Sequence, residues 1–207
     1  NQGKLSDEDM AKYALTYYMA QDKSGLDVDN DSLIRIAYDW YGEHQDDSLY
    51  ASSLYYMGKC FMLNDSMELA KACLEKSYSI SDSLHNMNVK CLALDKLIEV
   101  EEQLAPYKAL NYAKTLVRLY DSMPNVTIYN KVAARLRLCD NYMFVDSLGL
   151  ALCEGKIALH FAIVSTDREL YSFVCQDLAN VYEKMGEKDS CLFYAQQSYR
   201  LKNADRF

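Results

Sequence analysis

An interval of twelve residues recurs four times along this chain, and each time at least one end of the interval is a small residue. The four pairs are Gly58 and Ala70, Leu97 and Ala109, Cys139 and Ala151, and Ala179 and Cys191. Apolar residues around these positions lie at helical spacing. Because small side chains let two antiparallel helices approach closely, the interval predicts a series of tight helical hairpins.

The composition agrees with a helical protein. The 207 residues include only two prolines and seven glycines, and half of them are hydrophobic. About ten helices of three to four turns would fill the chain without any strand. A net charge of −8 argues against a nucleic-acid surface and against an anionic membrane face. We see no apolar run of the roughly 18 residues that cross a bilayer, so the sequence predicts no membrane-spanning segment.

The tripeptide Asp-Ser-apolar occurs seven times, as in Asp31-Ser32-Leu33 and Asp65-Ser66-Met67. The side chains of Asp and Ser accept hydrogen bonds from the first N–H groups of a helix, so these triplets predict helix boundaries with N-capping side chains. Pro106 stands where a first-turn proline is tolerated, and Gly186 stands where a helix is expected to end. Pro124 fits either the first turn of a helix or the loop before it.

The residues around each interval resemble the tetratricopeptide repeat (TPR), whose signature is W-x2-L-G-x2-Y followed by A-x3-F. One copy reads Leu54-x2-Met57-Gly58-x2-Phe61, and the same unit continues with Ala70-x3-Leu74. The Trp position and the closing proline of the family are replaced. The resemblance implies an all-α fold, a right-handed α-α superhelix (a TPR-like solenoid) of about five helical hairpins.

By this resemblance residues 1–207 form a single solenoid domain. Residues 7–46 are expected to form a degenerate helix pair that caps one end of the array, because a repeat buries its apolar face only against its neighbours. The expected TPR-like repeats are 48–84, 87–123, 127–165 and 168–203.

In TPR arrays the first helix of each repeat lines a concave groove. The corresponding positions in this sequence are Tyr55, Lys59, Met62, Leu94, Ile98, Leu136, Asp140, Gln176 and Asn180, with Glu101, Met143, Phe173 and Glu183 beside them. Aromatic, apolar and polar residues together suit a bound peptide or helix. An ordinary solvated or packed face is the alternative. The pairs Tyr55/Lys59 and Gln176/Asn180 differ from the Lys/Asn/Arg clamps with which some TPR proteins hold a C-terminal carboxylate.

No catalytic, phosphate-binding or metal-ligand pattern appears in the sequence. Asp27, Asp29 and Asp31 alternate like the start of a calcium loop, but Ser32 and Tyr38 stand where that loop needs Gly and Glu. The seven cysteines include no C-x-x-C pair and are expected to be small core residues. The sequence therefore predicts a non-enzymatic protein without cofactor or metal.

Two functions stay open. One is a scaffold for protein–protein interaction that binds a peptide or protein partner, with no nucleic acid. The other is the sensor or regulatory segment of a longer membrane-tethered signalling or transcription-regulating protein, with any membrane contact made outside this chain. The chain is similar to TPR segments of bacterial lipoproteins, which implies an extracytoplasmic, periplasmic location, and the cytoplasm is the alternative. The Asp-Ser-Leu and Asp-Ser-Met serines also resemble acceptors of periplasmic O-glycosylation.

Overall fold

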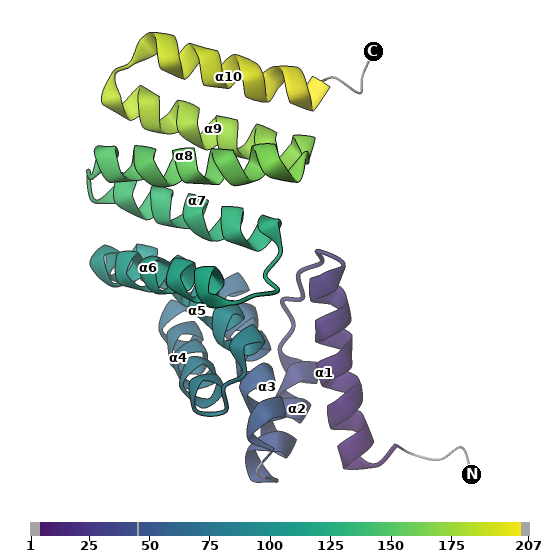
Figure 1. Ribbon diagram of the computed structural model, residues 1–207. Helices are drawn as coiled ribbons and strands as arrows, with labels where there is room; N and C mark the ends of the chain where they lie inside the picture. Colours follow the sequence, from purple (N-terminus) through teal and green to yellow (C-terminus); the bar gives the residue numbers. More distant parts are fainter. Residues whose placement is uncertain (1–4, 45, 204–207) are drawn as a thin grey trace. The chain divides into compact units, whose positions relative to one another are not determined.

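A computed structural model describes residues 5–44 and 46–203, and in these residues it contains ten α-helices and no strand (Figure 1). The helices are α1 (Asp7–Lys23), α2 (Ser32–Glu43), α3 (Asp47–Leu63), α4 (Met67–Ser83), α5 (Met87–Leu104), α6 (Pro106–Ser122), α7 (Ile128–Phe144), α8 (Leu148–Ser165), α9 (Arg168–Met185) and α10 (Lys188–Asn203). The all-α prediction is confirmed. The chain divides into two compact units, 1–101 and 102–207, with the division inside α5. One continuous solenoid domain over 1–207 stays a prediction.

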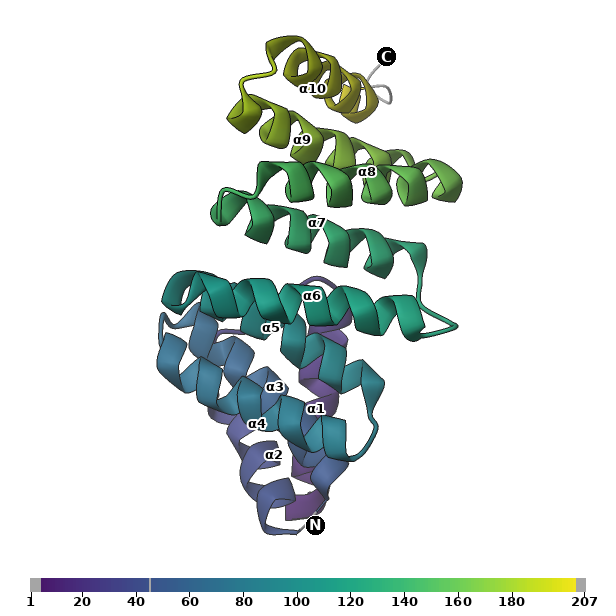
Figure 2. The ribbon, with the colours of Figure 1, turned by 60° about the vertical axis from the view of Figure 1, so that its left-hand side comes forward.

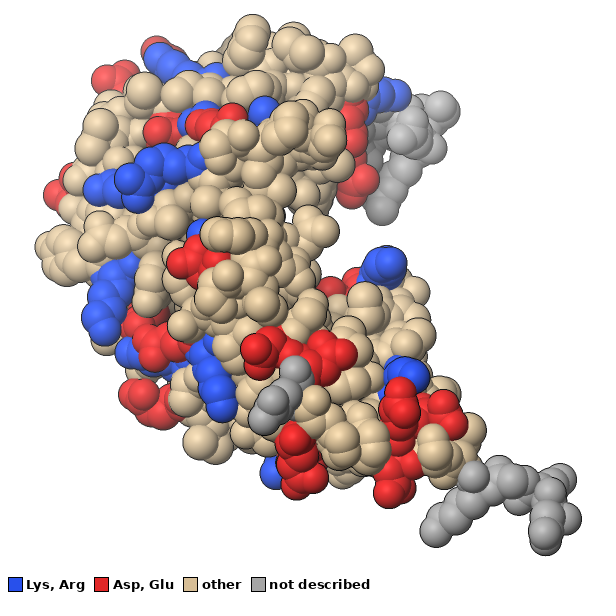
Figure 3. Space-filling view, turned by 60° about the horizontal axis from the view of Figure 1, so that its bottom comes forward, with Lys and Arg blue, Asp and Glu red and all other residues tan. Residues whose placement is uncertain are grey.

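The first unit contains two antiparallel hairpins, α1 with α2 and α3 with α4. Helix α2 also packs on α3, and α1 touches α3 through the aromatic rings of Tyr18 and Tyr56, whose centroids are 6.0 Å apart. Acidic side chains are concentrated where α1 begins: its first turn contains Asp7, Glu8 and Asp9, and Figure 3 shows red side chains gathered at that end of the unit. This placement favours the helix, because carboxylates stabilise the positive end of the helix dipole.

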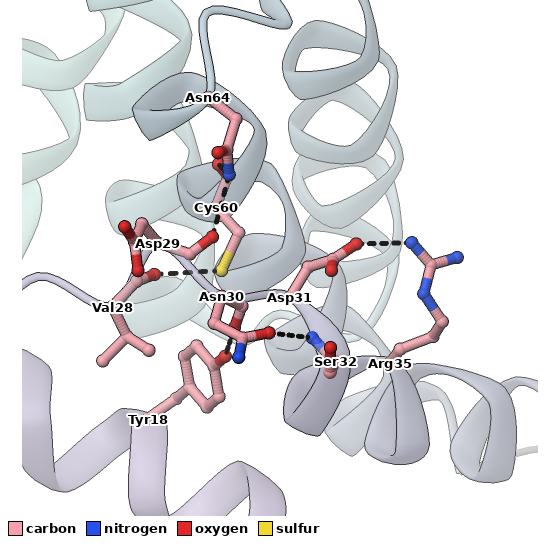
Figure 4. Close-up of polar contacts among 9 residues, drawn as sticks. All are labelled: Tyr18, Val28, Asp29, Asn30, Asp31, Ser32, Arg35, Cys60 and Asn64. Atoms are coloured by element: carbon pink, nitrogen blue, oxygen red, sulfur yellow. Dashed lines mark hydrogen bonds and ion pairs between the residues drawn. The ribbon is translucent and has the colours of Figure 1, made fainter.

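The long connection between α1 and α2 is held against two helices (Figure 4). Tyr18 of α1 donates its hydroxyl hydrogen to the carbonyl of Asn30. From α3, the Cys60 thiol donates to the carbonyl of Val28 at 3.2 Å, and the Asn64 amide donates to the carbonyl of Asp29 at 2.8 Å. Three backbone carbonyls of an acidic loop are thus satisfied by side chains, which fixes its path. The described residues contain no group of His, Cys, Asp or Glu side chains that could hold a metal ion.

In the second unit, helices α6 to α10 pack in chain order, each beside the next (Figures 1 and 2). Helices α7 and α8 form one hairpin and α9 and α10 form another, and α7 also touches α9. The core between them consists of residues such as Val132, Ala158, Val174 and Leu178, all fully buried. Helix α6 begins at Pro106 in its first turn, as predicted, and Pro124 lies in the loop that follows the helix.

Two glycines mark close helix contacts, one within a hairpin and one between neighbouring hairpins. A Cβ atom on Gly58 of α3 would lie 2.8 Å from the Leu74 Cγ and 3.4 Å from the Ala70 carbonyl oxygen of α4. On α8, a Cβ atom on Gly155 would lie 2.8 Å from the Leu178 Cδ2 of α9. Real Cβ atoms essentially never lie this close to another atom, so a side chain at either glycine would require its leucine neighbour to shift. The predicted nesting of Gly58 and Ala70 in one hairpin is confirmed.

The Asp-Ser triplets lie at helix boundaries, but the predicted N-capping is wrong for several of them. Asp31, Ser66 and Ser147 precede α2, α4 and α8 without a side-chain capping bond. Instead, Asp65 and Asp146 adopt left-handed backbone conformations, with φ of 54° and 57°, that end the preceding helix. In both turns the backbone N–H groups of Asp and Ser return to carbonyls of that helix, as in Ser66 to Phe61 at 2.8 Å and Asp65 to Met62 at 3.1 Å. This is the Schellman arrangement, which usually contains glycine.

Glycine occupies the equivalent place after α9, where Gly186 has φ of 77°, as the sequence predicted. Side-chain N-caps occur elsewhere. Asp46, Thr127 and Asp167 accept hydrogen bonds from the third residue of α3, α7 and α9 at 3.0 to 3.2 Å.

Contrary to the sequence prediction, one helix of the described chain, α8, is long and apolar enough to cross a membrane by length and composition. The charged residues Glu154 and Lys156 interrupt the apolar run of this helix, so the sequence alone did not indicate a segment of sufficient hydropathy. Helix α8 packs against α7 and α9, and Glu154 pairs with Arg135 at 2.8 Å. A core helix of a soluble protein passes the same test, so the property is weak evidence for a membrane segment.

Candidate binding face on α7 and α9

The candidate site in the second unit is the face shared by α7 and α9. We define this α7–α9 face by Leu136 and Asp140 of α7 and by Phe173, Gln176, Asp177 and Asn180 of α9. The α9 residues follow one another at i, i+3, i+4 and i+7, which places them on one side of the helix. Phe173, Gln176 and Asp140 are exposed, whereas Leu136, Asp177 and Asn180 are partly buried. The face therefore offers aromatic, amide and carboxylate groups to solvent.

Two carboxylates dominate the electrostatics of this face. Burial raises the pKa of Asp140 to about 6. The charge of Glu102 also raises this pKa, whereas the charges of Arg137 and Lys184 lower it. Burial and the nearby Asp140 charge raise the pKa of Asp177 to about 7. In the part of the chain that the structure describes, neither carboxylate forms an ion pair.

The sequence analysis missed Asp177, although the helical spacing from Phe173 and Gln176 could have placed it on this face. Gln176 and Asn180 lie side by side, with the Gln176 Nε2 3.5 Å from the Asn180 Oδ1. Gln176 also borders a pocket of about 480 Å³ against α10, together with Gln196, Tyr199 and Arg200. The α7–α9 face thus continues into a hollow at one edge.

The predicted site residues of the first unit lie in a different environment. Tyr55, Leu94 and Ile98 are buried, with exposed fractions of 3%, 0% and 0%. They are core residues rather than lining residues of an open groove. Burial raises the pKa of Tyr55, and the charges of Asp22 on α1 and Asp95 on α5 raise it further.

Lys59 and Met62 of α3 are partly buried. The Lys59 ammonium group is occupied by Asp22, with which it forms an ion pair, and Asp27 lies 3.8 Å away. Of the flanking positions, Glu101 is fully buried and pairs with Lys71 at 2.9 Å. Most of the first-unit positions predicted for the groove are thus engaged in packing or ion pairs within that unit.

No protein-family model matches the sequence, and no curated protein matches it either. Solved structures do match. The TPR-like repeats of a Podosopora anserina protein described as a kinesin light chain superpose with a TM-score of 0.81 over 98% of this chain and 99% of that one, at 11% identity. The hairpins and these similarities define the fold as that of the TPR-like repeat proteins.

Two further structures extend the comparison. A signal transduction ATPase with numerous domains (STAND) from Pyrococcus horikoshii, which has a tetratricopeptide repeat sensor, matches with a TM-score of 0.76 and 14% identity. That match covers 96% of this chain and 31% of the ATPase. MamA MSR-1 C2 matches with a TM-score of 0.65 and 17% identity over 96% and 98% of the two chains. At these identities the similarities show the fold alone.

Proposed function

We propose that the protein is a non-enzymatic scaffold that binds a peptide or protein segment on the α7–α9 face. The fold supports protein–protein interaction in general, because stacked helical hairpins expose an extended surface, and the matching solved structures consist of the same kind of repeats. The observation that carries the choice of face is the pair Asp140 and Asp177. The charge of Asp140 raises the pKa of Asp177, and among the described residues no cation forms an ion pair with either carboxylate.

A partner with Lys or Arg side chains would relieve this arrangement. A cation near two carboxylates favours their charged forms and offsets the cost of their desolvation. Phe173, 47% exposed, and the half-buried Leu136 would contribute apolar contact beside the charge. The proposed ligand is therefore a basic segment with at least one apolar side chain, laid along α7 and α9.

Selection from a library of short random peptides tests this proposal. The whole chain should enrich peptides with Lys or Arg beside an apolar residue. The variant Asp140→Asn/Asp177→Asn should lose that enrichment, whereas Ile163→Ala, an exposed apolar change on α8, should keep it. Equal enrichment on the wild type and the Asn variant would place the binding surface elsewhere.

The second candidate is a sensor or regulatory segment of a longer membrane-tethered protein in an extracytoplasmic compartment. It is supported by the match to the Pyrococcus horikoshii STAND protein, in which a region of this fold serves as a sensor within a much longer chain. Fractionation of cells that express the complete gene product tests it. Recovery of this segment in the membrane fraction, accessible to protease from outside, supports the sensor function, and recovery in the cytosol supports the free scaffold.

A further inference from the structure

A second feature of the 102–207 unit lies on the other side of α7. Leu138 and Tyr142 of α7, together with residues of α6 and α8, line a pocket of about 450 Å³. Residues two apart on an α-helix point about 200° away from each other, so Leu138 and Tyr142 point away from Asp140 and the α7–α9 face. The pocket is within the size range of small-molecule sites, about 300 to 1,000 Å³.

Three of the eight residues that line the pocket, Val117, Leu138 and Tyr142, are apolar or aromatic, and the other five are polar or charged. Val117 and Leu138 are buried beneath it, with exposed fractions of 8% and 3%. The Tyr142 ring forms a wall, and the Lys114 Nζ lies 5.4 Å from its centroid. An ammonium group over an aromatic face is held by the ring quadrupole, which positions Lys114 beside the hollow.

Two cations border the pocket from one helix. Lys114 and Arg118 are four residues apart on α6 and therefore lie on the same side of it. The Arg118 guanidinium donates to the Thr115 hydroxyl at 3.1 Å. Among the described residues neither cation forms an ion pair. Two like charges at i and i+4 destabilise a helix. The pair Lys114 and Arg118 is therefore an unfavourable local cluster of positive charge in a chain whose net charge is −8.

The one acid in the lining does not neutralise these cations. The Glu154 Oε2 accepts a hydrogen bond from the Arg135 Nη1 at 2.8 Å. Arg135 also donates to both carboxylate oxygens of Asp121, at 3.0 and 2.7 Å. Glu154 thus pairs with the buried Arg135. The positive charges of Lys114 and Arg118 in the pocket lining are therefore not neutralised by Glu154.

We infer that this α6–α8 pocket binds a small carboxylic acid with an apolar, preferably aromatic, body. The carboxylate would meet the guanidinium fork of Arg118 and the ammonium group of Lys114, since the arginine fork matches carboxylate geometry. The hydrocarbon part would rest on Val117 and Leu138 and against the Tyr142 ring. This site is independent of the proposed peptide-binding face, because it uses the opposite side of α7.

Titration of the whole, isotopically labelled chain with 3-phenylpropionate tests the inference by NMR. We expect saturable shifts at Arg118, Leu138 and Tyr142 with a Kd on the order of 1 mM or tighter. The uncharged 3-phenylpropanamide should bind at least about tenfold more weakly, because it lacks the charge that Arg118 and Lys114 recognise. Lys114→Gln and Arg118→Gln should each weaken phenylpropionate binding about fivefold or more. Lys156→Gln, an exposed change on α8, should leave it unchanged.

A second experiment distinguishes a small carboxylic acid from the C-terminal carboxylate of a peptide, which has the same chemistry. A short peptide that ends in phenylalanine with a free carboxylate is compared with 3-phenylpropionate and with the amidated peptide. Tighter binding of the small acid supports the inference. It is overturned if only the free-carboxylate peptide binds, if no ligand saturates by about 10 mM, or if the shifts lie on the α7–α9 face. Unchanged melting temperatures for both Gln variants exclude unfolding as the cause of weaker binding.

Discussion

Gly58 and Leu74 are in direct contact across the α3–α4 hairpin, at a distance that excludes any side chain on the glycine. A Cβ atom at Gly58 would lie 2.8 Å from the Leu74 Cγ and 2.9 Å from its Cδ2. Beside them, the Ser77 hydroxyl of α4 donates to the Ala51 carbonyl of α3 at 2.7 Å. The hairpin is therefore fixed by a steric fit and by a buried hydrogen bond.

Gly58→Ala should destabilise the first unit. Overpacking costs about 1 to 3 kcal/mol, which exceeds the gain of about 1 kcal/mol from replacing glycine in a helix. Gly149→Ala on α8 is the matched control, because a Cβ atom there meets nothing within 4 Å. It should not destabilise the chain. Urea unfolding measures both changes, and equal effects of the two alanines would contradict the close contact.

Asp65→Gly should stabilise the α3–α4 turn. Asp65 has φ of 54°, a left-handed conformation that costs an L-residue about 1 kcal/mol relative to glycine. We expect a gain of about 0.5 to 1 kcal/mol. Ser52→Gly, within α3, should instead destabilise by about the helix penalty of glycine, up to about 1 kcal/mol. A loss of stability in Asp65→Gly would show that the aspartate side chain holds this turn.

The carboxylates of the α7–α9 face should make stability depend on pH. Their folded-state pKa values, about 6 for Asp140 and about 7 for Asp177, lie above the ordinary value of 3.8. The folded state therefore binds protons more tightly than the unfolded state, and the two groups favour folding most at low pH. This contribution is complete below about pH 4 and is lost as the pH rises through 6 to 7.

Asp177→Asn should accordingly raise the melting temperature at pH 8 and change it little at pH 4. Glu187→Gln, an exposed change after α9, is the control. A side-chain titration by NMR in which both aspartates titrate near pH 4 would contradict the electrostatic description of this face.

Arg135 should be essential to the second unit. Its guanidinium joins Asp121 of α6 to Glu154 of α8 and lies 5.6 Å from the Phe161 ring. Arg135→Met should cost about 1 to 3 kcal/mol, between the values for an exposed and a buried ion pair, because Arg135 is buried whereas the Asp121 carboxylate is 45% exposed. Lys131→Met, on the same helix, should cost much less. A double change of Asp121 and Glu154 to their amides should recover part of the loss.

The hairpins were predictable from the sequence because their cause is local. The spacing from Gly58 to Ala70 follows from two helices and a short turn, and the structure places these residues in one hairpin. The role of Asp65 was misread for a different reason. Aspartate suits both an N-cap and a left-handed helix end, and only the backbone path decides between them.

The candidate site was harder to predict because exposure depends on neighbouring helices. Tyr55 and Gln176 occupy equivalent positions in the repeat pattern, yet Tyr55 is buried and Gln176 is exposed. The surroundings that bury Tyr55, and the charges of Asp22 on α1 and Asp95 on α5 that act on it, cannot be inferred from the sequence pattern of α3. The electrostatic link between Asp140 and Asp177 likewise joins two helices 37 positions apart in the sequence and has no local signature.

The most direct test of peptide binding on the α7–α9 face is to map where a selected basic peptide contacts the chain. Backbone NMR shifts or hydrogen-exchange protection would be measured on the whole protein with and without the peptide. We predict changes concentrated at Asp140 on α7 and at Gln176, Asp177 and Asn180 on α9, which disappear in Asp140→Asn/Asp177→Asn. Changes confined to other helices, or unaltered in that variant, would contradict it.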